Sequence, residues 1–509
     1  MKNIHGLLLV GCSAVALAGC GADDIASPGT GGNVTINNTT NNPAPTPTPT
    51  PTPTGGAITP ASGCPTIADP QGLTDDGTIT GPTGTYRVCS LPNKINESIK
   101  LTKISGLLYQ LKGRVDVGDD GGFTGGSDTN VTLSIDPGVI VFGGTGVSWL
   151  AVNRGNKINA VGTQTQPIIF TSRDNVLGLN TENSSAQWGG VVLMGRGKVT
   201  DCNYGSVAAG TCERDTEGAA DPAIFGGADD TYNAGTIDYV QVRFSGYVIG
   251  ADKELQSLTP EAVGSGTSIS HFMTYNSSDD GIEFFGGVTN LKYYVAVGAE
   301  DDNLDVDTGA RVNAQYVIVA QRQDVGDTMM EIDSNGLESD TPRTNIKVAN
   351  FTYIQRKSGN SDGTSMFFRG NSDVTLMNGI LISPNNPCLG IHNSFTTAAF
   401  ESVLMQCGSP KYINTGSAAA DAGESFFGAG DNNDDSFSPT LTSLFINGSN
   451  ESGVTAFDPS TVDSFFDATD YVGAVKDAAD TWYGGWTCNS TAADFGVGNS
   501  GLCTSLPTS

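Results

Sequence analysis

Acidic residues recur at matching places in three successive segments near the middle of the chain. The segments are Asp279-Asp-Gly-Ile-Glu283, Asp301-Asp-Asn-Leu-Asp-Val-Asp307 and Met330-Glu-Ile-Asp333. If the segments are stacked strands, their apolar residues alternate inward and Glu283, Asp305 and Glu331 point outward in one row. Aligned carboxylates repel one another, so the row needs a cation, sugar hydroxyls or raised pKa values. Ca²⁺ takes roughly six to eight oxygen ligands, and the candidate ligands are Asp279, Asp280, Glu283, Asp301, Asp302, Asp305, Asp307, Glu331 and Asp333.

Three other interpretations of the same acids stay open. Glycoside hydrolysis needs a pair of carboxyl groups, for which Asp279, Asp280 and Asp302 are the candidates. A calcium-dependent lyase would also need a basic residue, and the sequence offers Lys292, Arg311, Arg322 and Arg343 nearby. Asp and Asn also cap turns routinely, with no further function. Our first expectation is therefore that the protein has no catalytic residues.

The remaining chemistry-bearing residues form no known catalytic motif. His271 lies in an apolar strand between Ser270 and Phe272, and His392 is isolated. The sequence has no HExxH, Walker loop or dinucleotide-binding glycine motif.

The elements that position the acids are short β-rich runs bounded by Gly, Asn and Asp. Residues 268–290 and 291–313 are adjacent blocks of 23 residues, and each holds an apolar strand, an acidic turn, a second strand and a Gly turn. Repeats of about 20–30 residues with several short strands are typical of solenoids. One coil cannot bury its own apolar face, whereas stacked coils can. The pattern predicts an all-β parallel β-helix.

The first twenty residues have the features of a lipoprotein export signal. Lys2 is followed by an apolar run and then by Leu17-Ala-Gly-Cys20, and the run is too short to span a bilayer permanently. We expect lipidation at Cys20, and Gly21 in place of Asp favours the outer membrane. Residues 21–63 are rich in Gly, Asn, Pro and Thr, so they bury too little apolar area to fold and form a disordered linker.

The charge and the cysteine content of the chain fit an extracellular location. The chain has 25 Lys and Arg against 54 Asp and Glu, a net charge of −29 that excludes nucleic acid as a partner. Two of its ten cysteines are Cys12, in the signal, and Cys20. The other eight suit an oxidising compartment. Short loops close most easily, which favours the bridges Cys64–Cys89, Cys202–Cys212, Cys388–Cys407 and Cys488–Cys503.

These features divide the chain into five parts. They are a signal peptide (1–19), a lipid-anchored linker (20–63), an N-terminal cap with the first coils (64–130), a parallel β-helix (131–430) and a C-terminal cap (431–509). Because an open coil exposes unpaired main-chain groups, we expect the disulfide-bearing terminal segments to act as caps.

Several motifs in the body resemble one family of large bacterial cell-surface and secreted proteins, often lipoproteins. The motifs are Pro137-Gly-Val-Ile140, Arg154-Gly-Asn-Lys-Ile-Asn-Ala160, Trp188-Gly-Gly-Val-Val-Leu193, Val263-Gly-Ser-Gly-Thr267, Asp279-Asp-Gly-Ile-Glu-Phe-Phe-Gly-Gly287 and Gly485-Trp-Thr487. The resemblance covers roughly residues 110–490 and implies a right-handed parallel β-helix. The overall layout also resembles alphaproteobacterial extracellular lipoproteins that are released under phosphate starvation. Ser278 to Ile282 is similar to the paired-Asp motif of polygalacturonases, but Thr308-Gly309 stands where those enzymes have His-Gly.

These observations predict a non-enzymatic binding or accessory lipoprotein that supports nutrient acquisition, which the resemblance links to phosphate. We expect it to be anchored in the outer membrane by lipid, at the cell surface or secreted. Its expected cofactor is Ca²⁺. Its expected partners are a polymer or small nutrient and a secretion machinery or surface transporter. A polysaccharide-active enzyme and a structural or adhesive surface protein are the alternatives.

Overall fold

The computed structural model describes residues 58–216, 223–247, 255–334 and 339–507. These residues belong to one folded unit, Gly55–Ser509. The predicted signal peptide, Cys20 and the linker as far as residue 57 lie outside the described residues. Within the described part, neither helix has the length and apolar character that crossing a bilayer requires.

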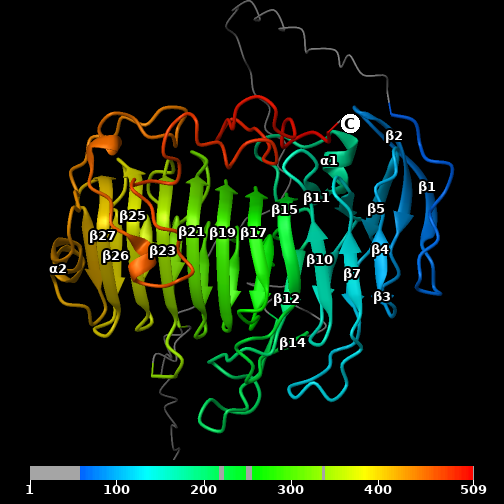
Figure 1. Ribbon diagram of the computed structural model, residues 1–509, viewed down its shortest axis with the longest axis horizontal. Helices are drawn as coiled ribbons and strands as arrows, with labels where there is room; N and C mark the ends of the chain where they lie inside the picture. The colour runs from blue at the N-terminus through cyan, green and yellow to red at the C-terminus, as the bar shows by residue number, and fades with distance from the viewer. Residues whose placement is uncertain (1–57, 217–222, 248–254, 335–338, 508–509) are drawn as a thin grey trace, which may run out of the picture. The chain divides into compact units, whose positions relative to one another are not determined.

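Two long sheets make up the body, and we call them the wide and the narrow sheet (Figure 1). The main path of the 15-stranded wide sheet is β1 (Thr74–Gly81), β2 (Gly84–Ser90), β5 (Leu107–Leu111), β8 (Ile140–Gly143), β11 (Ile168–Ser172), β15 (Gly235–Arg243), β17 (Ser268–Tyr275), β19 (Val288–Val297), β21 (Arg311–Ala320), β23 (Asn345–Ile354), β25 (Asp373–Ser383) and β27 (Thr397–Cys407). A branch of this sheet contains β4 (Ile99–Leu101), β7 (Thr132–Ile135) and β10 (Lys157–Val161).

The 11-stranded narrow sheet runs β3 (Lys94–Ile95), β6 (Arg114–Val117), β9 (Trp149–Val152), β12 (Gly190–Met194), β16 (Leu258–Glu261), β18 (Glu283–Phe285), β20 (Asp305–Asp307), β22 (Met330–Ile332), β24 (Met366–Phe368), β26 (Leu389–His392) and β28 (Tyr412–Thr415). The other elements are the hairpin β13 (Arg214–Asp215) and β14 (Ile224–Phe225), the helices α1 (Arg173–Leu177) and α2 (Ala422–Ala429), and the 3-10 turns Glu451–Gly453 and Pro459–Thr461.

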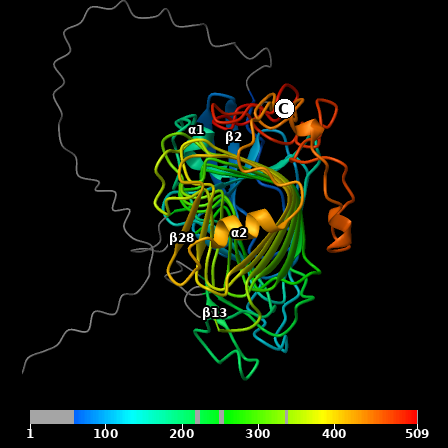
Figure 2. The same ribbon diagram turned by 90° about the vertical axis from the view of Figure 1, so that its left-hand side faces the viewer.

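From β15 to β28 consecutive strands alternate between the two sheets, and in the earlier coils two strands of the wide sheet precede each strand of the narrow sheet. Neighbouring coils pair in parallel within each sheet, so the predicted parallel β-helix is confirmed. Figure 2 looks into the coils from the end that carries α2. Inward-facing apolar residues of both sheets form one continuous core, which includes Phe284, Leu304 and Val306. Stacking therefore buries the face that a single coil would expose.

Each strand of the wide sheet from β15 to β27 bends at one residue with a left-handed backbone. The bending residues are Tyr239, His271, Tyr293, Tyr316, Asn350, Asn378 and Ser402, with φ between 42° and 64°. At the first bend β15 joins the sheet's two branches, because Ile237 pairs with Ala160 of β10 and Val240 with Ile168 of β11. A left-handed residue turns the chain sharply, so one strand covers two walls of the coil.

The N-terminal end is closed slightly earlier in the sequence than predicted. Ile58 forms a bridge with Gly84, and Ala61 donates its N–H to the Gly106 carbonyl at 3.0 Å. Residues 58–63, assigned to the linker from composition, are therefore part of the folded unit. The antiparallel hairpin of β1 and β2 then forms the outermost layer of the wide sheet.

The C-terminal end differs from the predicted cap. The helix α2 packs on the last coil, where Phe427 contacts Phe400 and Tyr412, and residues 431–437 pair with β27. Residues 438–507, which we call the return segment, instead run back along the wide sheet toward β2, as the orange-to-red trace in Figure 1 shows. Leu506 at its end packs with Tyr86 and Val88 of β2.

Side chains of the wide sheet hold the return segment in place. Asn378 donates to the carbonyl of Phe457 at 2.8 Å, and Asn350 donates to that of Tyr471 at 3.0 Å. Near the segment's end, the buried Arg243 donates to the carbonyls of Cys503 and Ser505, at 3.0 and 2.9 Å. Asn350 and Asn378 therefore have two roles: their backbone bends the strand, and their side chain binds the return segment.

Four disulfide bonds join cysteines of the described residues, in the same four pairs that loop length favours. They are Cys64–Cys89, Cys202–Cys212, Cys388–Cys407 and Cys488–Cys503. Each closes a loop of 10 to 25 residues, which limits the freedom of the unfolded chain around it.

A candidate cation-binding row on the narrow sheet

The acidic segments occupy adjacent strands of the narrow sheet in the expected register. Glu283 of β18 pairs with Asp305 of β20, which pairs with Glu331 of β22. Their neighbours Phe284, Val306 and Ile332 lie in the core. The three carboxylates therefore form one column on the outer face, which we call the acidic row.

The acidic row is much less exposed than an outer face suggests. Glu283 is 6% exposed and Glu331 is 9% exposed, while Asp305 is partly buried with its Oδ1 shielded from solvent. On one side of the row Glu331 pairs with Phe367 of β24. Beside the row, two residues after Glu283 on β18, the outward Phe285 contacts Phe225 of the hairpin β13–β14. Burial makes each unneutralised charge in the row costly.

The turn aspartates that precede the strands link one coil to the next. Asp280 accepts a hydrogen bond from the N–H of Asp302 at 2.8 Å, and Asp302 accepts one from the N–H of Thr328 at 2.6 Å. Both Asp280 and Asp302 are buried. Turn capping is therefore one function of these two residues, and it uses one oxygen of each.

Three groups of carboxylates have oxygens close enough to share a metal ion. They are Asp279 with Asp280 and Asp301, Asp280 with Glu283 and Asp305, and Asp302 with Asp305 and Glu331. Within each group the oxygens lie within 4.8 Å of one another. Seven of the nine predicted ligands thus come together, and Asp280 and Asp305 each belong to two groups.

The other two predicted ligands lie outside these groups. Asp307 accepts a hydrogen bond from the N–H of Thr308. Asp333 accepts one from the N–H of Ser334 at 2.6 Å and pairs with Arg369 at 2.8 Å.

Crowding shifts the protonation of these acids. Burial, reinforced by the carboxylates around them, raises the pKa of Asp280, Asp305 and Glu331 well above the usual range. Arg369 is the cation paired with the row, at 2.7 Å from Glu331. The guanidinium offsets only part of the repulsion at Asp305 and Glu331, whose pKa values stay raised, so protons or metal ions are left to balance the rest.

Two further acids in this region were missed by the sequence analysis. Burial and the carboxylate of Asp302 raise the pKa of Asp327 to about 7 and that of Asp362 to about 6. Asp362 also donates its N–H to Asp327 Oδ1 at 3.1 Å. Both residues lie in loops of unequal length, outside the repeating strand pattern. Arg369 was missed as well, although it follows the apolar run of the next coil.

The four basic residues that a lyase could have used form ion pairs with acids that lie outside the acidic row. Lys292 pairs with Asp467, Arg311 with Asp230, Arg322 with Asp324 and Arg343 with Asp373, at 2.6 to 2.9 Å. Each is thereby held in an ion pair with an acid outside the three carboxylate groups.

The aromatic residues of the wide sheet are a structural stack. Tyr239, His271, Tyr293 and Tyr316 lie ring on ring, with centroids 4.0, 4.4 and 4.9 Å apart. Trp486 meets the first two rings edge-on from the return segment. His271 also bonds Asp238 through Nδ1 at 2.9 Å. Because the inner ring faces cover one another, they are not open to a sugar ring.

The fold and the row define a parallel β-helix protein with an acidic outer column on its narrow sheet. A family model described as a pectate-lyase-like β-helix domain matches residues 95–425. The match spans more than half of the chain, and the protein belongs to this family. No curated protein and no solved structure matches it significantly. A β-helix domain of this kind fits a surface or polysaccharide-related protein.

Proposed function

We propose that the protein is an exported, lipid-anchored β-helix binding protein whose acidic row holds Ca²⁺, either to stabilise the coils or to bridge to an anionic ligand. The observation that carries the proposal is the buried column Glu283, Asp305 and Glu331. Arg369 pairs with Glu331 at one end of the column, while the pKa values of Asp305 and Glu331 remain raised by burial and neighbouring carboxylates. Ca²⁺ is a hard cation that favours carboxylate oxygens and flexible geometry.

The position of Asp305 strengthens the proposal. Its Oδ1 is buried and has no hydrogen-bond partner among the described residues. The same carboxylate belongs to two of the three groups whose oxygens converge within 4.8 Å. A buried oxygen without a donor is costly. A metal ion that Asp305 shares with Asp280 and Glu283, or with Asp302 and Glu331, would remove that cost.

The test is a calcium titration of the full-length chain after EDTA treatment, followed by calorimetry and thermal melting. Ca²⁺ at a hundred times its Kd should add about 2.7 kcal/mol to the free energy of unfolding. Mg²⁺, which dehydrates reluctantly, should add less. Asp305→Asn should abolish the response. Asp307→Asn, on the same strand and outer face but outside the three groups, should keep it. An unchanged melting temperature with Ca²⁺ would refute the proposal.

We propose that Cys20 carries lipid and that the protein is located at the outer membrane or the cell surface. We also propose that it supports nutrient acquisition, for which phosphate is one candidate nutrient. Metabolic labelling with palmitate, followed by fractionation, tests the anchor. Label should be incorporated in the wild type and lost in Cys20→Ala. Labelling of that variant would exclude Cys20 as the acylated residue.

A polysaccharide-active enzyme is the second candidate. It is favoured by the closeness of Asp279, Asp280 and the exposed Asp301, and by the pKa of about 7 at Asp327. A carboxyl group that holds its proton near neutral pH suits a general acid. Release of reducing sugar or of unsaturated product from acidic polysaccharides, with and without Ca²⁺, is the measurement. Activity that Asp280→Asn abolishes without loss of fold would favour this function over binding alone.

A further inference from the structure

The outermost strands at the two ends of the narrow sheet differ in how their free main-chain groups are covered. At the N-terminal end, β3 is the outermost strand, and side chains from the preceding segment cover its edge. Asp69 accepts hydrogen bonds from the N–H groups of Asn96 and Glu97, and Gln71 donates to the Lys94 carbonyl at 2.8 Å. These bonds satisfy main-chain groups that would otherwise face solvent.

At the C-terminal end only the wide sheet gains a further main-chain partner among the described residues. In the narrow sheet, the Asn414 side chain of β28 donates to the Ala420 carbonyl and accepts from the N–H of Gly423 in α2. The chain that follows α2 pairs with β27, since Ser402 donates to the Asp431 carbonyl and Met405 to that of Asp434, at 2.9 and 2.7 Å. The helix α2 packs over the core between the two sheets (Figure 2). β28, the last strand of the narrow sheet, pairs on one side only, with β26.

The unpaired edge of β28 presents regular main-chain groups. The carbonyl of Lys411 accepts from the N–H of Leu389 in β26. Because main-chain groups alternate in direction along a strand, those of Tyr412 and Asn414 face away from β26. Among the described residues these groups have no hydrogen-bond partner, which makes the edge a template for another strand.

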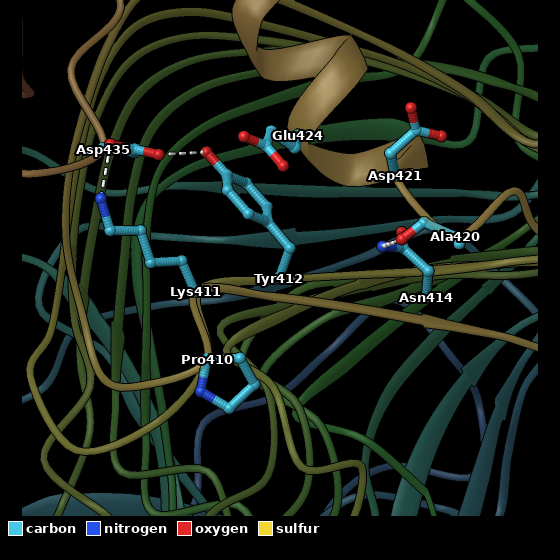
Figure 3. Close-up of a pocket in the computed structure, with 8 residues that line it drawn as sticks. All are labelled: Pro410, Lys411, Tyr412, Asn414, Ala420, Asp421, Glu424 and Asp435. Atoms are coloured by element: carbon cyan, nitrogen blue, oxygen red, sulfur yellow. Dashed lines mark hydrogen bonds and ion pairs between the residues drawn. The ribbon is translucent and has the colours of Figure 1, made fainter.

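A cavity of about 430 Å³ lies over this edge, between β28 and the start of α2 (Figure 3). On one side of the cavity, Asp435 is already paired with the Lys411 ammonium at 2.7 Å and the Tyr412 hydroxyl at 2.8 Å. Asp421 and Glu424 also line it; both are exposed, and neither has an ion-pair partner within the described chain. The cavity thus combines strand-pairing groups with two uncompensated negative charges.

We propose that β28 is a docking edge that accepts an extended segment of a partner polypeptide as one more strand, with a Lys or Arg side chain directed to Asp421 and Glu424. Main-chain hydrogen bonds supply affinity in this mode of recognition, and side-chain pockets supply specificity. The unpaired edge of β28 supports the addition of a strand, and charge complementarity supports the Lys or Arg side chain. The proposal is independent of calcium binding by the acidic row.

The probe is a fluorescent peptide of alternating Val and Lys, with anisotropy measured against the full-length chain. We expect saturable binding. A peptide of alternating Val and Glu should bind about ten-fold more weakly or worse, which corresponds to about 1.4 kcal/mol. The Val and Lys peptide with alternate main-chain nitrogens methylated should not bind, because it lacks the donors for strand pairing. Equal binding of the methylated peptide would show plain charge attraction and overturn the proposal.

Matched charge reversals locate the site. Glu424→Lys should reduce binding of the Lys peptide about ten-fold or more, and Glu424→Gln should have a smaller effect. Glu97→Lys makes the same charge change at the opposite end, at another exposed acid, and should leave binding close to wild type. Equal losses in Glu424→Lys and Glu97→Lys would overturn the proposal. So would a wild-type dimer in sedimentation that Glu424→Lys dissociates, because a second copy would then occupy the edge.

Discussion

Glu283 of β18 and Asp305 of β20 stand directly opposite each other in neighbouring parallel strands. Like charges in this position are destabilising in a sheet, and burial strengthens their interaction. The structure places the pair beside Glu331, so the repulsion extends along the column.

Replacing Asp305 with Asn should have opposite effects with and without calcium. In EDTA the free energy of unfolding should rise by roughly 1 kcal/mol, because one member of a repelling column becomes neutral. In saturating Ca²⁺ the variant should be less stable than the wild type, which alone gains the metal's contribution. Urea denaturation under both conditions measures the crossover. If Asp305→Asn were less stable than the wild type in EDTA, repulsion within the acidic row would be contradicted.

Stability in EDTA should fall as the pH rises from about 4 to about 7. The pKa values of Asp327 and Asp362 rise on folding, from 3.8 to about 7 and about 6. In this window the folded chain holds more protons than the unfolded chain, so raising the pH favours unfolding. Because a pKa difference of one corresponds to about 1.4 kcal/mol, the two rises together predict a loss on the order of 6 kcal/mol over this window. Asp327→Asn should flatten the dependence in urea titrations at several pH values, and a profile that rises over this window would exclude the mechanism.

Gly379 should be intolerant of a side chain. It lies in β25 opposite Phe351 of β23, and a Cβ there would fall 1.9 Å from the ring of Phe351, which is itself buried. Gly379→Ala should therefore cost roughly 1–3 kcal/mol. Gly428→Ala is the control, since a Cβ in that exposed part of α2 meets nothing within 4 Å, and it should stabilise by up to about 1 kcal/mol. Thermal melts of both variants decide the matter.

Arg243 should be essential for holding the end of the return segment. Burial lowers its pKa to about 9, and it donates to Gln241 Oε1 and to the carbonyls of Cys503 and Ser505. Arg243→Met leaves those carbonyls without their donor and should cost roughly 3 kcal/mol. Limited proteolysis should then cut residues 487–507 sooner than in the wild type. Arg173→Met, a partly exposed Arg in α1, is the control, and equal cleavage rates in both variants would contradict this role.

The repeating part of the fold was accessible from sequence because it depends on local alternation. Ile282 and Phe284, Leu304 and Val306, and Met330 and Ile332 alternate with acids, which is enough to assign the inward face. The same alternation, and not the length of the blocks, aligned Glu283 with Asp305 and Glu331 in advance. Two equal blocks of 23 residues would place Glu283 opposite Val306, whereas the structure pairs it with Asp305.

What the sequence could not supply comes from parts of the chain that do not repeat. Asp327 and Asp362 reach the acidic region from loops of different lengths, and only the folded backbone brings them beside Asp302. The return segment has no periodic pattern of its own, and its contacts with Asn350 and Asn378 join residues far apart in the chain. Burial of the acidic row also depends on neighbouring strands and loops, which alternation within one strand does not reveal.

The return segment makes the first coils depend on residues that are synthesised much later. Asn175 donates to the Cys503 carbonyl across 328 residues of sequence, and Leu506 completes the apolar cluster around β2. A chain that emerges from a ribosome or a translocation pore with its N-terminus first cannot finish folding in that order. Its earliest coils stay partly uncovered until residues 503–506 are released, so a stop codon just before these residues would damage the opposite end of the β-helix.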